Sequence, residues 1–580
     1  MGQNDWRVQP DNTIQVVDPK SPQRKGLVTG VEEPRKNYRG MFIAWLIIFL
    51  VLLAVVISVA IIGVRDPRYV LIGRRLRVQD VLEHSFRASP FFAAWRGNVL
   101  VYKDSTGALM QYDVMKNSSK VLFQLPQKEQ VWHIDTLLSS DGRYVLERRK
   151  IKHGLRGAIE AQYSLHDVYD GHQFPVLLSR DSLEDPYLQM TLFSPGPAPP
   201  RLAVVHSGDI YLLSAVESPE AVRLTETVAD GPAVLNGVTN WWYRETLLNT
   251  PQAMWFSRSG NQLMFVTFND TELDTVDILS YRKGADAVIR KMAYPKRNGP
   301  LTAISIAVCH VEKTLANKSP EITHLTSAFL ESSYLTGVQW VDEATVAVTS
   351  MSRALTSAQV SLCTAPAWHC SEVYAAANWR WVSELQPVFA TGYSDFVVKT
   401  DDTEEHGEEM VEVMVQEGVK IRSKASGHRI VTLQFWDRQE HGIYYTGVED
   451  TRPSETHLYW RPDSAAGQRA GAACLTCGVS TLLGRPCSRL TPIFGPNSDA
   501  LALECAQGPV RSLHVLDRAV TRRLAELDSS RALAERMAVP HVFSETVSLG
   551  GEYVRLELIL PALWEEKKGG TYLYPFVLDM

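Results

Sequence analysis

The first hydrophobic pattern along the chain is one uninterrupted apolar run. Residues 41–64 read MFIAWLIIFLVLLAVVISVAIIGV, without a charged side chain. As a helix this run would extend roughly 36 Å, which is enough to cross a bilayer with some tilt. A buried core helix rarely stays apolar on every face for so long, and a signal peptide has a shorter apolar core nearer the N-terminus. The run therefore predicts a transmembrane signal-anchor helix, with the lipid bilayer as a partner.

After this run, a polar turn followed by a short apolar or alternating strand recurs along the chain. Examples are SSDGRYVLERR from Ser139, SRSGNQLMFVTF from Ser257 and GPNSDALALECA from Gly495. Turn residues that bound short strands, with few long helical patterns between them, are typical of antiparallel sheets. Repeated sheets of this kind form either a stacked sandwich or a propeller. The repeats have diverged too far for the pattern alone to fix a period.

The C-terminal segment has a different pattern. Residues 545–561 alternate on both sides of Gly550-Gly551, which predicts a β-hairpin. Residues 572–580 are apolar on both faces. Such a run suits a strand in the middle of a sheet that helices cover on both sides.

Composition restricts the class of protein. Of the 580 residues, 45% are hydrophobic and 21% are charged, which is typical of a folded globular chain. The net charge of −6 and the pI near 6.2 give no electrostatic reason to expect nucleic-acid binding. Residues 1–40 show little apolar pattern, so we expect a disordered cytoplasmic tail there.

Basic residues do not set an orientation for the apolar run, because five Lys or Arg side chains precede it and five follow it closely. The sequons at Asn117, Asn269 and Asn317 all lie after the run and predict N-glycosylation. They favour a single-pass type II plasma-membrane protein whose large C-terminal part is extracellular.

The seven cysteines also follow the apolar run, and six of them fall in close pairs: Cys363/Cys370, Cys474/Cys477 and Cys487/Cys505. Short closed loops suit disulfides in an oxidising compartment, whereas Cys309 is left unpaired. The C-x-x-C at 474–477 also matches a redox motif or half a zinc site. Because the sequence has no second C-x-x-C and no βαβ pattern around this one, a structural disulfide is favoured. We predict no metal site and no cofactor.

Several segments together resemble the propeller of the dipeptidyl peptidase IV family, in the prolyl oligopeptidase clan. They are NGVTNWWYRET from Asn236, WFSRSG from Trp255, FNDTE from Phe268, AYPK from Ala293, the cysteines at 474, 477, 487 and 505, and the closing LILP and YPFVLDM. The NYRG segment before the apolar run is similar to the non-catalytic dipeptidyl aminopeptidase-like proteins 6 and 10. That branch accompanies A-type voltage-gated potassium channels.

The resemblance implies an all-β fold, an eight-bladed β-propeller, with one transmembrane helix before it and a remnant of an α/β-hydrolase domain after it. The implied domains are a disordered tail (1–40), a transmembrane signal-anchor helix (41–64), a stalk (65–85), the propeller (86–540) and the truncated start of the hydrolase domain (541–580).

The hydrolase part is where the sequence departs from the family. No G-x-S-x-G elbow is present, and the nearest string, residues 392–396, lacks the last glycine. The elbow presents the nucleophilic serine beside the oxyanion hole, and the histidine and aspartate that follow it in the family are also absent from this chain. The chain is a fragment, a truncated isoform or an incomplete gene model, and we expect no peptidase activity from it.

A second departure concerns capture of the substrate. Active family members grip the free amino terminus of the substrate with two adjacent glutamates, because charge-assisted hydrogen bonds give strength and selectivity. The matching positions are Glu245 and Thr246, so one carboxylate is lost. Arg156 aligns with the arginine that binds the substrate carbonyl in the family. The alternative for Glu245 is an ordinary polar residue on a short helix.

Two functions follow from these features. The first is a non-enzymatic membrane glycoprotein that assists the trafficking and gating of a voltage-gated potassium channel. The second is a serine-type dipeptidyl peptidase whose catalytic domain is missing from this chain. The predicted partners are the bilayer, a potassium channel and a second copy of the chain, without nucleic acid.

Overall fold

The computed structural model describes two parts of the chain, which fall into compact units at residues 1–70 and 71–580. The described residues are 38–63, 77–79 and 92–560, the last range with gaps at 105–107, 125–136, 155–157, 180–185, 197–199, 217–219, 228–232, 282–286, 327–332, 402–407, 425–427, 450–451, 467–470, 480–486, 488, 496–499, 508–509, 518–521 and 530–540. The predictions for residues 1–37, most of the stalk and the final strand at 572–580 lie outside this part.

The first unit contains the helix α1 (Tyr38–Gly63). Among the described residues, no helix combines the length and the apolarity needed to span a membrane. We therefore correct three predictions: the transmembrane helix over 41–64, the bilayer as a partner and the single-pass plasma-membrane localisation are not supported by the described part of the chain.

The second unit is built mainly from antiparallel sheets. The first four sheets in chain order are β1 (Ala93–Arg96), β2 (Val99–Lys103), β3 (Leu109–Asp113) and β4 (Ser118–Phe123); β5 (Leu137–Leu138), β6 (Tyr144–His153), β7 (Ile159–Asp167) and β8 (Gln173–Pro175); β9 (Met190–Phe193), β10 (Leu202–His206), β11 (Asp209–Leu213) and β12 (Ala221–Arg223); and β13 (Val234–Asn236), β15 (Gln262–Asn269), β18 (Ala303–His310) and β19 (Ile322–His324), with β14 (Met254–Phe256) on β15.

Four further sheets follow along the chain. They are β20 (Ser333–Trp340), β21 (Thr345–Ser352), β22 (Ser357–Thr364) and β23 (His369–Ala377); β24 (Val388–Phe389), β25 (Phe396–Asp401), β26 (Glu408–Met414) and β27 (Val419–Lys424); β28 (His428–Asp437), β29 (Gly442–Glu449), β30 (Arg452–Pro462) and β31 (Ala473–Cys474); and β32 (Leu490–Phe494), β33 (Ala500–Gln507), β34 (Val510–Asp517) and β35 (Arg522–Ser529).

Two hairpins and three short helices complete the described elements. The hairpins are β16 (Thr275–Ser280) with β17 (Val288–Ala293), and β36 (His541–Leu549) with β37 (Glu552–Leu560); the helices are α3 (Val311–Asn317), the π-helix η3 (Tyr243–Leu247) and the 3-10 helix η5 (Ser464–Ala466). The β36–β37 turn uses Gly550 and Gly551, both at positive φ. The hairpin predicted from residues 545–561 is therefore confirmed.

The polar segments predicted as turns before the strands do form hydrogen-bonded turns. Ahead of β6, the Ser139 hydroxyl donates to Asp141 and accepts from the backbone N–H of Tyr144 at 2.9 Å. Ahead of β15, Gly260 has φ +76°, and a Cβ there would lie 2.2 Å from the carbonyl oxygen of Pro195. A side chain at Gly260 would thus meet both backbone strain and a clash. Each turn is closed by a backbone hydrogen bond from its glycine to its first serine, Gly142 to Ser139 and Gly260 to Ser257.

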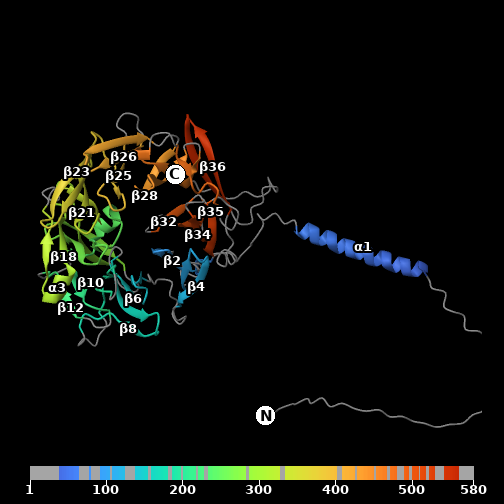
Figure 1. Ribbon diagram of the computed structural model, residues 1–580, viewed down its shortest axis with the longest axis horizontal. Coiled ribbons are helices and arrows are strands. Elements are labelled where there is room, and N and C mark those ends of the chain that lie inside the picture. Colours follow the sequence, from blue (N-terminus) through green and yellow to red (C-terminus); the bar gives the residue numbers. More distant parts are fainter. Residues whose placement is uncertain are drawn as a thin grey trace, which may run out of the picture. The chain divides into compact units, whose positions relative to one another are not determined.

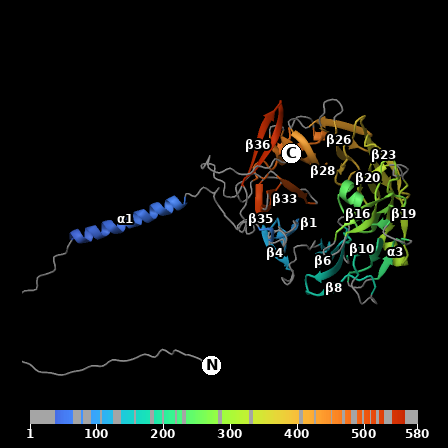
Figure 2. The same cartoon turned by 180° about the vertical axis from the view of Figure 1, so that it is seen from behind.

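Apolar clusters join each sheet to the next in the chain from the second sheet to the eighth. The first and second sheets meet through the rings of Phe123 and His166, whose centroids are 5.2 Å apart. One more cluster unites the first sheet with the eighth, through Leu100 and Tyr102 on one side and Leu513 and Val515 on the other. In Figure 1 and Figure 2 the strands of the eighth sheet accordingly lie beside those of the first.

A buried carboxylate in the second sheet gives the fold a predicted pH dependence. Glu147 of β6 accepts a hydrogen bond from Arg149 at 2.7 Å and contacts the imidazole of His166 on β7. Burial alone would raise the pKa of Glu147, but the hydrogen bonds from His166 and Arg149 outweigh it and the pKa is lowered. The unfolded state then binds the proton more tightly. The stabilisation is present above the pKa of an unfolded glutamate, about 4.3, and is lost as the pH falls.

We expect Glu147→Gln to be less stable than the wild type at neutral pH, and the two proteins to converge below about pH 4, because protonation removes the same charge. Denaturant titrations across this pH range measure the difference in unfolding free energy. Glu160→Gln, which changes an exposed carboxylate of β7, is the matched control. A difference between Glu147→Gln and wild type that does not vary with pH would contradict the prediction.

Candidate functional site

The short π-helix η3 carries the two positions predicted to face a substrate amine. It lies between β13 and β14, and a network of polar side chains fixes its start. The side-chain oxygen of Asn240 accepts from the backbone N–H of Tyr243 at 2.8 Å, and the Asn240 amide donates to Asp270 at 3.0 Å. Thr302 donates to the same carboxylate at 2.7 Å. Burial raises the pKa of Asp270, and these two hydrogen bonds only partly offset it.

Aromatic side chains hold the inner side of η3. Tyr243 is buried and packs on Phe268, with ring centroids 4.9 Å apart, and burial raises its pKa. Trp241 donates its indole N–H to the carbonyl of Ala293 at 2.9 Å and stacks on Tyr294. Leu247 packs against the same core as Tyr243, and two side chains of η3 remain exposed.

The two exposed side chains are Glu245 and Thr246. The Glu245 carboxylate lies 3.4 Å from the guanidinium Nε of Arg244. The Thr246 hydroxyl donates to the carbonyl of Trp242 at 2.5 Å. The position therefore offers a single carboxylate with a cation beside it, where two carboxylates would be needed to hold an ammonium group. Arg156 lies outside the described residues, so its place relative to Glu245 stays a prediction.

Sequence reasoning missed Arg244 and the Asn240–Asp270 pair. Only the capping role of Asn240 had a signal in the sequence, because an asparagine three residues before Tyr243 has the spacing of a helix cap. Arg244 was visible as a neighbour of Glu245, but residues adjacent in a helix do not usually face each other. Its contact with the carboxylate appears only in the folded geometry.

The structure forms the three disulfides predicted from the sequence. Cys363–Cys370 joins paired residues of β22 and β23, Cys474–Cys477 closes a short loop after β31, and Cys487–Cys505 ties the segment before β32 to β33. Cys309 is the remaining cysteine, and it is buried. Its thiol lies 3.2 Å from the Thr314 hydroxyl, and burial raises its pKa to about 11, so it is unreactive at neutral pH.

The three sequons lie at different kinds of position. Asn117 and Asn317 are exposed, and Asn117 adopts positive φ in the turn between β3 and β4. Asn269 is half-buried at the end of β15, where its side-chain oxygen accepts from the backbone N–H of Thr271 at 3.0 Å. Glycosylation at these sites stays a prediction.

Comparison with known proteins places these features in context. The family model for the dipeptidyl peptidase IV (DPP IV) N-terminal region matches residues 139–477. Similar curated proteins include the inactive dipeptidyl peptidase 10 of Mus musculus, 24% identical over 499 residues, and the venom dipeptidyl peptidase 4 of Apis mellifera, 23% identical over 527 residues. The matches cover 83% and 87% of this chain, and 60% and 65% of those relatives. The chain thus spans less than two thirds of their length.

Among solved structures, dipeptidyl peptidase 4 of Porphyromonas gingivalis matches with a TM-score of 0.65 and 16% sequence identity. The match covers 84% of this chain and 67% of that protein. At this identity the likeness speaks for the fold alone. It agrees with the strand-rich second unit.

Proposed function

Because the chain belongs to the dipeptidyl peptidase IV family, we propose that its second unit is an eight-bladed propeller that binds another protein and does not hydrolyse peptides. The propeller is supported by the eight sheets that follow one another in chain order. It is supported further by the cluster that unites the first sheet with the eighth, because a closed ring of sheets leaves no open end.

The single observation that carries the non-enzymatic part is the state of the η3 helix. An ammonium group gains most from a site that presents more than one carboxylate away from water. Here Thr246 has replaced one acid, and the guanidinium of Arg244 offsets the charge of Glu245. The Glu245 carboxylate is exposed, so solvent also weakens any attraction that remains.

We expect the wild-type chain to bind a short Xaa-Pro peptide no better with a free N-terminus than with an acetylated one, because the net charge of Arg244 and Glu245 together is zero. In the double variant Arg244→Glu, Thr246→Glu we expect a preference for the free amine, which isothermal titration calorimetry measures. The matched control is Arg244→Gln, Thr246→Gln. It places side chains of the same length at both positions and adds no carboxylate beside Glu245. A wild-type preference for the free amine would contradict the proposal.

The absence of hydrolysis is tested separately. A dipeptidyl-proline chromogenic substrate should stay intact with the purified chain, since no G-x-S-x-G elbow is present in its sequence. Turnover that survives repurification and that a serine-directed inhibitor abolishes would overturn the non-enzymatic proposal.

The second candidate is a serine-type dipeptidyl peptidase whose catalytic domain is not part of this chain. The β36–β37 hairpin favours it, because Phe543, Leu556 and Ile559 are among several large apolar side chains exposed on it. Residues 541–580 would then begin an α/β-hydrolase domain that covers this surface. Sequencing the transcript beyond codon 580 decides between the candidates. A G-x-S-x-G elbow with a later aspartate and histidine favours the peptidase, and an altered elbow favours the binding protein.

The finer form of the first candidate is an accessory subunit of an A-type voltage-gated potassium channel. Its support is the resemblance of the NYRG segment to the non-catalytic branch of the family. Co-precipitation of the full chain with such a channel from co-expressing cells tests it, and the absence of any complex would contradict it. Light scattering tests the predicted homodimer in the same way.

A further inference from the structure

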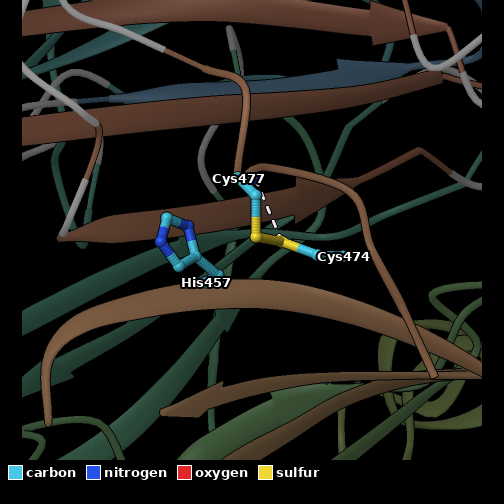
Figure 3. A group of neighbouring side chains, drawn as sticks. All are labelled: His457, Cys474 and Cys477. Carbon is cyan, nitrogen blue, oxygen red and sulfur yellow. Dashed lines mark hydrogen bonds between the residues drawn. A yellow bond between two sulfur atoms is a disulfide. The ribbon is translucent and has the colours of Figure 1, made fainter. Parts of the chain in front are cut away.

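A histidine lies against the loop that carries the C-x-x-C motif. His457 comes from β30, Cys474 from β31, and Cys477 from the loop that follows. One nitrogen of the imidazole and the two sulfur atoms all lie within 4.8 Å of one another. Figure 3 shows the His457 ring beside the two cysteines. Thiolate and imidazole are the ligands that zinc prefers. In the oxidised protein the two sulfurs are bonded to each other, so they are not available to a metal.

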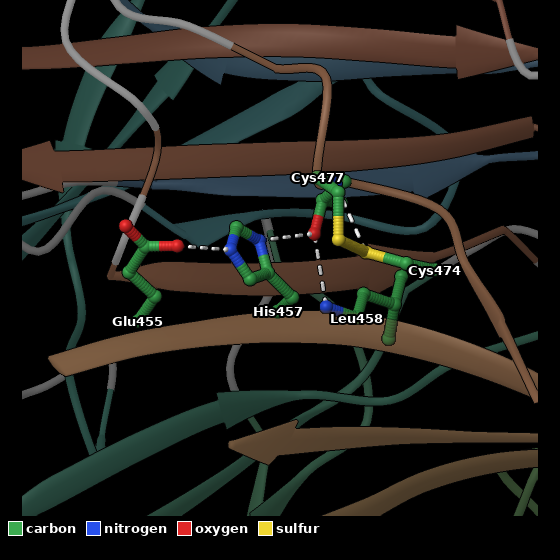
Figure 4. Close-up of a disulfide and its surroundings, with 6 residues drawn as sticks. Glu455, His457, Leu458, Cys474 and Cys477 are labelled. Carbon is green, nitrogen blue, oxygen red and sulfur yellow. Dashed lines mark hydrogen bonds and ion pairs between the residues drawn. A yellow bond between two sulfur atoms is a disulfide. The ribbon is translucent and has the colours of Figure 1, made fainter. Parts of the chain in front are cut away.

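The hydrogen bonds around His457 assign its tautomer. The Thr476 hydroxyl accepts from the backbone N–H of Leu458 at 2.9 Å, which leaves its own proton for Nδ1 of His457 at 3.3 Å. The other ring nitrogen, Nε2, lies 3.4 Å from the carboxylate of Glu455 (Figure 4). The proton therefore sits on Nε2, where the carboxylate accepts it. Nδ1 keeps its lone pair and directs it at the loop that carries both cysteines.

This arrangement is one that metal sites use. A histidine that binds a metal through one nitrogen commonly donates its other N–H to a carboxylate, which fixes the ring and raises its basicity. Glu455 already stands in that place without a metal. His457 is only 4% exposed, Cys474 is half-buried and Cys477 is exposed, so a reductant and a metal ion can reach the sulfurs from one side.

We propose that reduction of the Cys474–Cys477 disulfide converts this cluster into a zinc site. Its ligands are the two thiolates and Nδ1 of His457, with water at the fourth position of the tetrahedron. The Thr476 hydroxyl turns away to make room. Zn–S distances of about 2.3 Å place the two sulfurs roughly 3.7 Å apart, which a C-x-x-C loop can span. The disulfide thus acts as a gate that closes the metal site under oxidising conditions.

The redox step balances with a dithiol as the reductant. One thiolate of the dithiol attacks one cysteine sulfur and releases the other cysteine as a thiolate. The second thiolate of the dithiol then attacks the mixed disulfide and displaces the attacked cysteine, as the dithiol closes into a cyclic disulfide. Two electrons and two protons pass from the dithiol to the cysteines. Zinc then replaces the two thiol protons, which are released to the solvent, so affinity for zinc rises with pH.

The test uses the full chain, reduced without oxygen by a water-soluble phosphine, which supplies the two electrons and becomes the phosphine oxide. We expect the oxidised chain to bind no zinc at this position and the reduced, still folded chain to bind one equivalent, measured by elemental analysis after desalting. Cobalt in place of zinc should give the intense visible absorption of a tetrahedral thiolate site. Circular dichroism reports whether the fold survives reduction.

Three variants identify the ligands. Cys477→Ser should abolish the cobalt spectrum, and His457→Gln should shift it and weaken zinc binding by more than tenfold. Glu455→Gln should weaken zinc binding by about tenfold, as expected for a group that orients a ligand. Cys370→Ser, in a different disulfide, should change neither. A reduced chain that binds no zinc, or a His457→Gln variant that binds it as tightly as wild type, would overturn the proposal. So would cobalt spectra that appear only after the fold is lost.

Discussion

Replacing Leu100 by alanine is expected to lower the free energy of unfolding by about 2–5 kcal/mol, and replacing Leu513 by alanine is expected to do the same. Both side chains are buried, with exposed fractions of 0% and 3%. They belong to one apolar cluster, although Leu100 lies in β2 of the first sheet and Leu513 in β34 of the eighth. Each substitution removes buried carbon and leaves a cavity that the surrounding strands fill only in part.

The double variant tests whether the two sheets meet in solution. Residues that share a cavity show interaction energies of about 0.5–3 kcal/mol in a double-mutant cycle, whereas distant residues are additive. We expect Leu100→Ala and Leu513→Ala to be non-additive in denaturant titrations. Leu335→Ala, in the core between the fourth and fifth sheets, is the control and should be additive with Leu100→Ala. Additivity of Leu100 with Leu513 would contradict a closed ring, and with it the proposed propeller.

Replacing Asp209 by alanine is expected to cost about 1–3 kcal/mol, because it leaves buried hydrogen-bond donors without their acceptor. The Asp209 carboxylate, at the start of β11, is 4% exposed. It accepts from Arg223 at 2.7 Å, and from the hydroxyls of Thr225 and Thr227 at 2.9 and 2.7 Å. It also accepts from the side-chain amide of Asn236 in β13 at 3.3 Å. Its removal leaves several donors without an acceptor, at the junction of the third and fourth sheets.

The charge of Asp209 contributes to this effect. Burial alone would raise the pKa of Asp209, but the hydrogen bonds from Thr227, Arg223 and Thr225 lower it. Its stabilisation is therefore present at neutral pH and is lost as the pH falls below the value of an unfolded aspartate, about 3.9. Asp209→Asn keeps the shape and should cost less than Asp209→Ala. Asp277→Ala, on the exposed side of β16, is the control and should stay within about 0.5 kcal/mol of wild type. An Asp209→Ala variant with a wild-type melting curve would contradict the prediction.

The features that the sequence predicted correctly are those set by neighbours along the chain. The turns at Ser139 and Ser257 close through hydrogen bonds within a few residues, so Ser, Asp and Gly at these positions are enough to identify them. The β36–β37 hairpin follows from its two glycines, and the three disulfides follow from cysteine spacing. Family membership also follows from local motifs, since the family model and the segments around η3 coincide.

The number of sheets did not follow from the repeat pattern, and eight blades were expected only from the resemblance to the family. A core position needs an apolar side chain of suitable size, and many sequences satisfy that requirement. Diverged repeats therefore keep their packing while their period disappears from the sequence. The apolar run at 41–64 is a case in which the pattern predicted too much. It predicted a membrane span, but no helix among the described residues is long and apolar enough to be one.

Contacts between distant segments were decided by the tertiary structure alone. The pairing of β30 with β31 brings His457 beside Cys474 and Cys477, and the meeting of the first and eighth sheets puts Leu100 and Leu513 in one apolar cluster. The position of Arg244 against Glu245 likewise depends on the network that fixes η3. The sequence determined the strands, turns and disulfides because short-range geometry sets them. The junction of the first and eighth sheets and the candidate sites depend on the register of many strands, and only the folded chain fixes that register.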